Sequence, residues 1–111
     1  MAKDSTSGLQ GALDLLVLKT LESCARMHGY GITVHIQSRS EDALRIEEGS
    51  LYPALHRMEE AGWIQAEWAK NEAGRRVRLY ELTAPGRKHL EAEEVRWHSV
   101  IAAVNRVLRL A

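Results

Sequence analysis

Residues 47–64 read EEGSLYPALHRMEEAGWI, a pattern that predicts a helix with a hydroxyl and a phenol near its start. We place this helix from Ser50 to Ala61 and end it at Gly62, because glycine accepts the positive φ that closes many helices. Ser50 is then at or beside the N-cap, and Pro53 falls in the first turn, where the N–H that proline lacks would have no partner. The proline therefore marks the start of a helix and not a kink.

The two faces of this helix have different compositions. Small side chains and an aromatic at the start of a helix can hold a DNA backbone or approach base edges in the major groove. The alternative is that Ser50 only caps the helix and Tyr52 packs as a half-buried aromatic. The face predicted to be buried carries Leu51, Ala54, Leu55 and Met58. The face predicted to contact DNA carries Ser50, Pro53, His56 and Arg57, with Tyr52 at its border.

Two further helices are predicted upstream. Apolar residues recur at helical spacing from Leu9 to Ala25, which indicates a well-buried first helix. The glycines of HGYG (28–31) interrupt it, and a second, short helix follows through Ile32 and Ile36 until the polar run SRSED (38–42). The next four residues, ALRI (43–46), are expected to form a brief extended segment.

After Gly62 apolar and polar residues alternate with a period of two in two successive segments, which predicts a β-hairpin. Its strands are Trp63–Ala69 and Arg76–Leu82, joined by KNEAGR. The chain has a formal net charge of zero, yet the segment from Lys70 to Lys88 holds six basic and two acidic residues. A basic patch on a neutral protein still attracts phosphate, although an ordinary solvated loop is the alternative. We predict DNA contacts from Lys70, Arg75, Arg76 and Arg78.

The remaining residues predict one long helix, with Thr83 as its cap, Pro85 in its first turn and an end at Leu110. Its apolar residues form two stripes, so it needs two partners. We expect one stripe to pack on the first helix and the other to meet the same helix of a second copy. The seam predicted for the dimer holds Leu90, Trp97, Ile101, Val104 and Leu108, interrupted by Glu94. The second stripe holds Val100, Ala103, Val107 and Leu110.

This order of elements predicts a mainly helical protein with a small β-hairpin. Residues 1–83 are expected to form a winged helix-turn-helix DNA-binding domain, and residues 84–111 a C-terminal dimerisation helix. Such a helix is roughly 40 Å long. Two recognition helices could then address half-sites about 34 Å apart on a near-palindromic operator.

Composition and motifs exclude several other classes. The 111 residues suit one domain, and the single cysteine, Cys24, permits no intrachain disulfide. No glycine-rich phosphate loop or catalytic triad is evident, so an enzyme is not expected. Cys24 with His28 and Glu94 with His98 have helical ligand spacing but lack further ligands, so neither a metal nor a cofactor is expected. The longest apolar run, LDLLVL, is too short for a bilayer, which favours the cytoplasm and no membrane contact.

As a set, EEGSLYPALHRMEEAGWI, GRRVRLYELTAPGRKHL and the upstream HGYGI resemble the PadR family of bacterial winged-helix transcriptional regulators. The resemblance runs from Leu13 to about Leu108. It implies a homodimeric repressor of the short branch, with one helix after the wing, whose segments 50–53 and 74–76 lie on DNA. Such regulators often respond to hydrophobic or phenolic compounds. Trp97 resembles the aromatic that stacks on flat drugs in a multidrug regulator, although a packing role in the dimer core explains it equally well.

The strongest rival is a winged helix that binds another protein and no DNA. Zero net charge and the pair Glu59-Glu60 favour this rival, whereas the basic wing opposes it. The salt dependence of binding distinguishes a DNA-binding regulator from a protein-interaction module. If each protomer neutralises about three to five phosphates, affinity for DNA falls steeply as salt rises.

Overall fold

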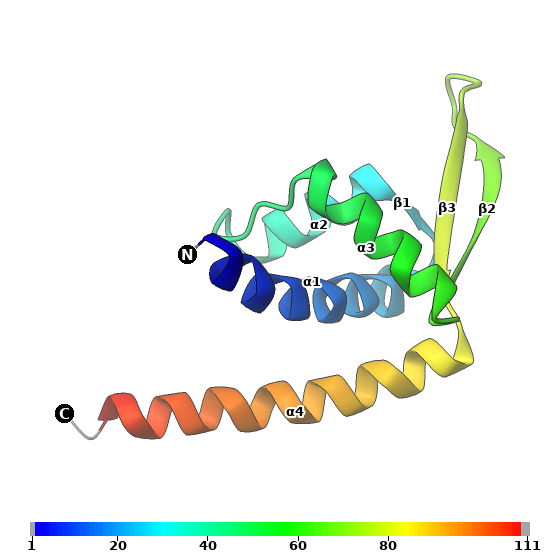
Figure 1. The fold of residues 1–111 in the computed structure, drawn as a ribbon. Helices are drawn as coiled ribbons and strands as arrows, with labels where there is room; N and C mark the ends of the chain where they lie inside the picture. Colours follow the sequence, from blue (N-terminus) through cyan, green and yellow to red (C-terminus); the bar gives the residue numbers. More distant parts are fainter. Residues whose placement is uncertain (1, 110–111) are drawn as a thin grey trace.

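The computed structural model describes the backbone of residues 2–109 and the side chains of residues 12–109. Helices α1, α2 and α3 form the head, a hairpin projects beside them, and α4 runs along the opposite side of α1 (Figure 1). In chain order the elements are α1 (Ala2–Cys24), β1 (Met27–His28), α2 (Gly29–Arg39), α3 (Glu48–Glu60), β2 (Ile64–Lys70), β3 (Arg76–Leu82) and α4 (Ala84–Arg109). The predicted class, a winged helix-turn-helix with a long C-terminal helix, is confirmed.

One apolar core joins all three head helices to the sheet and to α4. It confirms the buried face predicted for α3, and it draws Leu90 of α4 into the protomer itself. Burying each large aliphatic side chain contributes about 1.5–3 kcal/mol. The core comprises Leu13, Val17, Leu18, Leu21, Ile32, Ile36, Leu51, Ala54, Leu55, Met58, Ile64, Tyr80 and Leu90.

The start of α3 differs from the prediction. The helix begins at Glu48, and Glu47 is its N-cap, with an extended backbone (φ −84°, ψ 148°) and no side-chain cap. The N–H of Ser50 donates to the Glu47 carbonyl at 3.0 Å, so Ser50 lies inside the first turn and is not the cap. Pro53 is consequently deeper in the helix than the first turn. Its ring removes the hydrogen bond that an N–H here would give to the Gly49 carbonyl.

The end of α3 is as predicted. Gly62 has φ +82°, a conformation that side chains rarely adopt. Its N–H donates to the Glu59 carbonyl, and the N–H of Trp63 donates to the Met58 carbonyl, both at 3.0 Å. These two bonds form a Schellman motif, which satisfies carbonyls at the end of the helix. The chain leaves this turn directly into β2.

The sheet has three antiparallel strands in the order β1-β3-β2. The hairpin prediction is confirmed, except that β2 begins at Ile64 and not at Trp63, and that it includes Lys70, which faces Arg76 across the ladder. The third strand was not predicted: it is Met27–His28, which pairs with β3. Residues 43–46, predicted to be extended, form an irregular connection outside the sheet. Two residues are too few for the alternation that identifies a strand in a sequence.

Helix α1 begins before Leu9, the predicted start, and ends at Cys24. Ala25 then takes a positive φ of 60°, and the chain turns into β1. The HGYG segment therefore does not separate two helices as a loop. His28 closes β1 and caps α2: its Nδ1 accepts a hydrogen bond of 2.9 Å from the N–H of Gly31.

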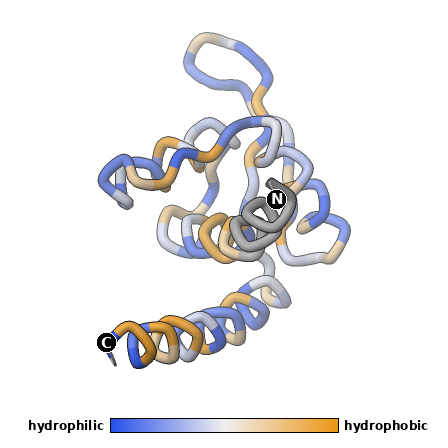
Figure 2. The backbone as a smooth tube through the Cα atoms, turned by 60° about the vertical axis from the view of Figure 1, so that its left-hand side comes forward, coloured by the Kyte–Doolittle hydropathy of each residue, from blue (hydrophilic) through white to orange (hydrophobic). Residues whose placement is uncertain are grey.

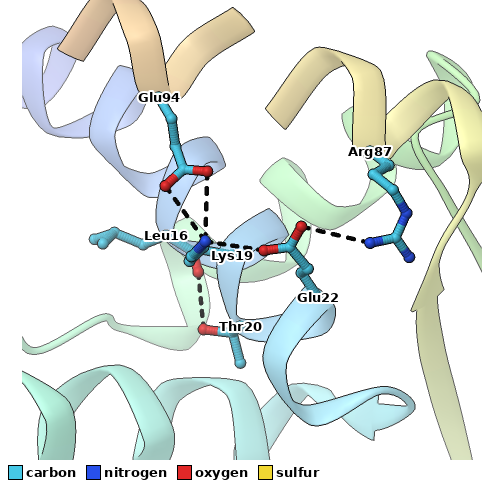
Figure 3. Close-up of polar contacts among 6 residues, drawn as sticks. All are labelled: Leu16, Lys19, Thr20, Glu22, Arg87 and Glu94. Atoms are coloured by element: carbon cyan, nitrogen blue, oxygen red, sulfur yellow. Dashed lines mark hydrogen bonds and ion pairs between the residues drawn. The ribbon is translucent and has the colours of Figure 1, made fainter. Parts of the chain in front are cut away.

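The first half of α4 is fixed to the head by polar contacts. As predicted, Thr83 caps the helix: its Oγ1 accepts a bond of 3.0 Å from the N–H of Gly86. Lys19 lies between Glu22 at 2.9 Å and Glu94 at 3.3 Å, and Arg87 reaches Glu22 at 3.4 Å (Figure 3). Hydrogen bonds to the two carboxylates raise the pKa of Lys19 above its ordinary value.

The second half of α4 carries apolar residues that no other described part of the chain covers. Figure 2 shows hydrophobic positions recurring along this end of the helix, which lies apart from the rest of the tube. The prediction that one stripe packs on the first helix is therefore wrong for Val100, Ala103 and Val107 of the second stripe. Exposed fractions are 45% for Val100, 50% for Ile101 and Val104, 68% for Val107 and 67% for Leu108. Leu110 lies outside the described residues.

Candidate nucleic-acid interface

Helix α3 and the tip of the hairpin lie on the side of α1 away from α4 (Figure 1). Between them is a concave surface of about 540 Å³ that also includes the start of α2. Most of its lining is aromatic or basic, a combination that suits the sugar and phosphate of a nucleic acid. It is formed by His28, Gly29, Tyr30, Tyr52, Trp68, Asn71, Arg76, Val77, Arg78 and Tyr80.

Tyr52 is the residue of α3 that borders this concave surface. Its side chain is 44% exposed, so it is neither a core residue nor free in solvent. The ring lies across the first residue of α2: a Cβ placed on Gly29 would be 2.7 Å from the Tyr52 hydroxyl oxygen. The phenol is therefore held between the two helices of the helix-turn-helix and the wing.

The first turn of α3 is acidic, a feature that the prediction of a phosphate contact through Ser50 did not take into account. Glu47 and Glu48 are both exposed there, and Glu48 complements the positive end of the helix dipole. Their negative carboxylates would repel a phosphate at this end of the helix. Ser50 is exposed in the same turn and is free to approach a base edge or a donor.

His56 and Arg57 point outward from α3 but have partners within the chain. His56 Nε2 lies 3.4 Å from Glu60, one turn further on. Arg57 Nη2 donates to Asp14 of α1 at 2.7 Å. The side chains of His56 and Arg57 are 73% and 46% exposed, so both could reach DNA only by leaving or sharing these carboxylates. Pro53 is exposed beside them.

The basic residues of the hairpin divide into two groups. Lys70 and Arg75 are exposed at its tip. Arg76 and Arg78 lie over the Trp68 ring, with their guanidinium carbons 4.5 and 5.4 Å from its centroid. Arg78 also donates to Glu59 of α3 at 2.9 Å, and this hydrogen bond raises the pKa of Arg78.

Trp68 and Tyr30 are interface residues that the sequence did not reveal. Trp68 is 54% exposed and Tyr30 is 67% exposed, both large values for aromatic side chains. The strand register carried a signal for Trp68, because it faces Arg78 directly across the hairpin. Tyr30 carried none, since its place depends on the start of α2.

Trp97 lies where the covered half of α4 meets the exposed half. Its side chain is partly buried, and its Nε1 is shielded from solvent without a hydrogen-bond partner among the described residues. Leu90, grouped with it in the predicted dimer seam, is instead fully buried in the protomer core. The other members of the seam, Ile101, Val104 and Leu108, are exposed.

Neither a cluster of metal ligands nor a membrane-spanning helix is found among the described residues. The Sγ of Cys24 contacts the ring of His35 at 3.6 Å, and its side chain is only partly buried. Within residues 12–109 no group of three or more potential metal ligands occurs. None of the described helices is long and apolar enough to cross a bilayer.

Comparison with known proteins agrees with this geometry. A model of the PadR-like transcriptional regulator family matches residues 17–92. A transcriptional regulator from Clostridium thermocellum is 25% identical and superposes with a TM-score of 0.81, covering 90% of this chain and 93% of its own. A PadR family regulator from Clostridium difficile is 30% identical, with a TM-score of 0.72 and coverage of 86% and 97%. A PadR family regulator from Eggerthella lenta is 27% identical and superposes with a TM-score of 0.74, covering 96% of this chain and 91% of its own. The chain therefore belongs to the PadR-like family of transcriptional regulators, which are non-enzymatic DNA-binding proteins.

Proposed function

We propose that this regulator is a cytoplasmic homodimeric repressor that binds a near-palindromic operator through α3 and the wing. The observation that carries the proposal is the concave surface that α3 and the basic hairpin line together, on the side of α1 away from α4; Figure 1 shows the placement of these elements. In this arrangement α3 approaches base edges in the major groove through Ser50, Tyr52 and Pro53. Lys70, Arg75 and Arg76 contact the flanking phosphates.

Residues 1–83 would bind DNA, and residues 84–111 would join the two copies. The support for this division is the exposed apolar stripe of Ile101, Val104 and Leu108 on α4, far from the wing. A row of aliphatic side chains that are half or more exposed is costly for an isolated chain and typical of a protein interface. Two such helices packed together would cover it in both copies.

We also place the inducer, an aromatic or hydrophobic molecule, beside Trp97. Its support is the position of Trp97 at the edge of the stripe and its unsatisfied indole N–H. A flat ligand could stack on the face of the indole. Quenching of tryptophan fluorescence by an aromatic cation or a neutral dye, lost in Trp97→Ala, would support the site. Quenching that survives the substitution would refute it.

Selection of duplexes from a random pool tests the function. The repressor proposal predicts enrichment of an inverted repeat whose half-sites are centred about one turn apart. Binding without enrichment would contradict a specific operator. No binding to any duplex, even at low salt, would favour the protein-interaction module, for which the acidic first turn of α3 is the structural argument.

A further inference from the structure

Gly29, the first residue of α2, lies against the phenol of Tyr52. A Cβ on Gly29 would lie 2.7 Å from the Tyr52 hydroxyl oxygen, 3.0 Å from Cζ and 3.1 Å from Cε1. Unstrained contacts between carbon atoms lie at about 3.5–4.0 Å. The ring therefore occupies space that any side chain at position 29 would take.

The contact is not required by the backbone of α2. Gly29 is the first residue of this helix and is absent from the residues with positive φ, so alanine could adopt its conformation. Alanine is also a better helix former than glycine. What a methyl group would displace is the Tyr52 ring, which can move because it is 44% exposed.

We propose that Gly29 is a positioning residue for DNA recognition: its missing side chain lets the Tyr52 phenol rest on α2 and form one wall of the concave surface. This inference rests on the proposed function, because it assigns Tyr52 to the operator interface. A directional contact with DNA depends on where the phenol oxygen lies, and a shift approaching 1 Å is enough to lose a hydrogen bond. Gly29 thus acts on DNA through Tyr52 and does not touch it.

The test is a cycle of Gly29→Ala, Tyr52→Ala and the double variant, each titrated against the selected operator. Gly29→Ala should lower affinity about tenfold, the size of one lost directional contact. Its thermal midpoint should equal or exceed that of the parent chain. In the Tyr52→Ala background the glycine substitution should change affinity little, because no ring remains to displace.

A second readout works without DNA. The ring current of Tyr52 should shift the Gly29 Hα resonances, and Tyr52→Ala should move them toward ordinary values. Absence of this change would overturn the contact even if the chain binds no duplex. If the parent binds its operator, unchanged affinity of Gly29→Ala would overturn the positioning role. An equal loss in both backgrounds would overturn it too, since the effect would then not pass through Tyr52.

Discussion

The basic residues near the candidate interface differ in whether they already form an ion pair within the chain. Arg57 and Arg78 each donate to a carboxylate of the head, at 2.7 and 2.9 Å. Within the described part of the chain Lys70 and Arg75 have no such partner. Counterion release should therefore come mainly from the wing tip and less from α3. This division could not be read from the sequence, where all these cations look alike.

Replacing Arg75 and Arg76 with alanine should weaken binding on every duplex alike, because phosphate contacts carry no sequence information. Each lost phosphate contact should also reduce the slope of log affinity against log salt by about 0.9. Fluorescence anisotropy at several salt concentrations measures both effects. Lys88→Ala removes a charge from α4, on the other side of the head, and is the control. A double variant with the parental slope would remove the wing from the interface.

At the scale of elements, sequence patterns predicted what depends on local rules. The buried face of α3, its end at Gly62 and the hairpin all follow from periodicity and turn chemistry. The start of α3 was misplaced, because Ser50 is a good cap but Glu48 and Gly49 extend the helix toward the N-terminus and Glu47 is the N-cap. Strand β1 was missed because it is held by pairing with β3, a partner distant in the sequence.

The same reasoning explains the error in α4. Periodicity predicted two apolar stripes, but which of their residues are covered within the chain depends on the direction in which the helix leaves the hairpin. Leu90 enters the core, and the apolar residues beyond Trp97 stay exposed. The sequence led to the polar face of α3 and the wing as a candidate site, and this assignment stays a prediction. The inclusion of Tyr30 and Trp68 required the packing of α2 against the hairpin.

The end of α3 gives a stability prediction. Gly62→Ala should lower the free energy of unfolding by about 1 kcal/mol, because alanine is strained at φ +82°. Gly49→Ala is the matched control: it lies in the same helix, and its Cβ would meet nothing within 4 Å. That substitution should be neutral or stabilising. Urea titration monitored by circular dichroism distinguishes the two variants; equal effects would contradict the assignment of the turn.

The exposed stripe of α4 gives a prediction about assembly. Ile101→Glu should dissociate the dimer, since a carboxylate would be buried in the seam without a partner. Val95→Glu is the control: Val95 is 68% exposed, lies roughly 120° around the same helix from Ile101 at 3.6 residues per turn, and should tolerate the charge. Sedimentation velocity gives the outcome directly. A dimer that survives Ile101→Glu, or is lost equally in Val95→Glu, would place the interface elsewhere.

The whole molecule is elongated, with principal extents of 56, 28 and 25 Å. The second half of α4, which carries the apolar stripe, and the tip of the basic hairpin lie at opposite ends of the molecule (Figure 1). Two copies joined along α4 would therefore leave both hairpins accessible. The separation needed between the two recognition helices is about 34 Å, one turn of the duplex. The length of α4 and its ionic attachment to α1 are what would set that distance.

The stoichiometry of the complex with DNA tests the central claim most directly. Sedimentation of the protein with a selected duplex should give two chains for each operator, and halving the duplex to a single half-site should cost most of the affinity. One chain bound with full affinity to a half-site would contradict the dimeric account, and a chain that sediments apart from every duplex at low salt would contradict DNA binding through this face.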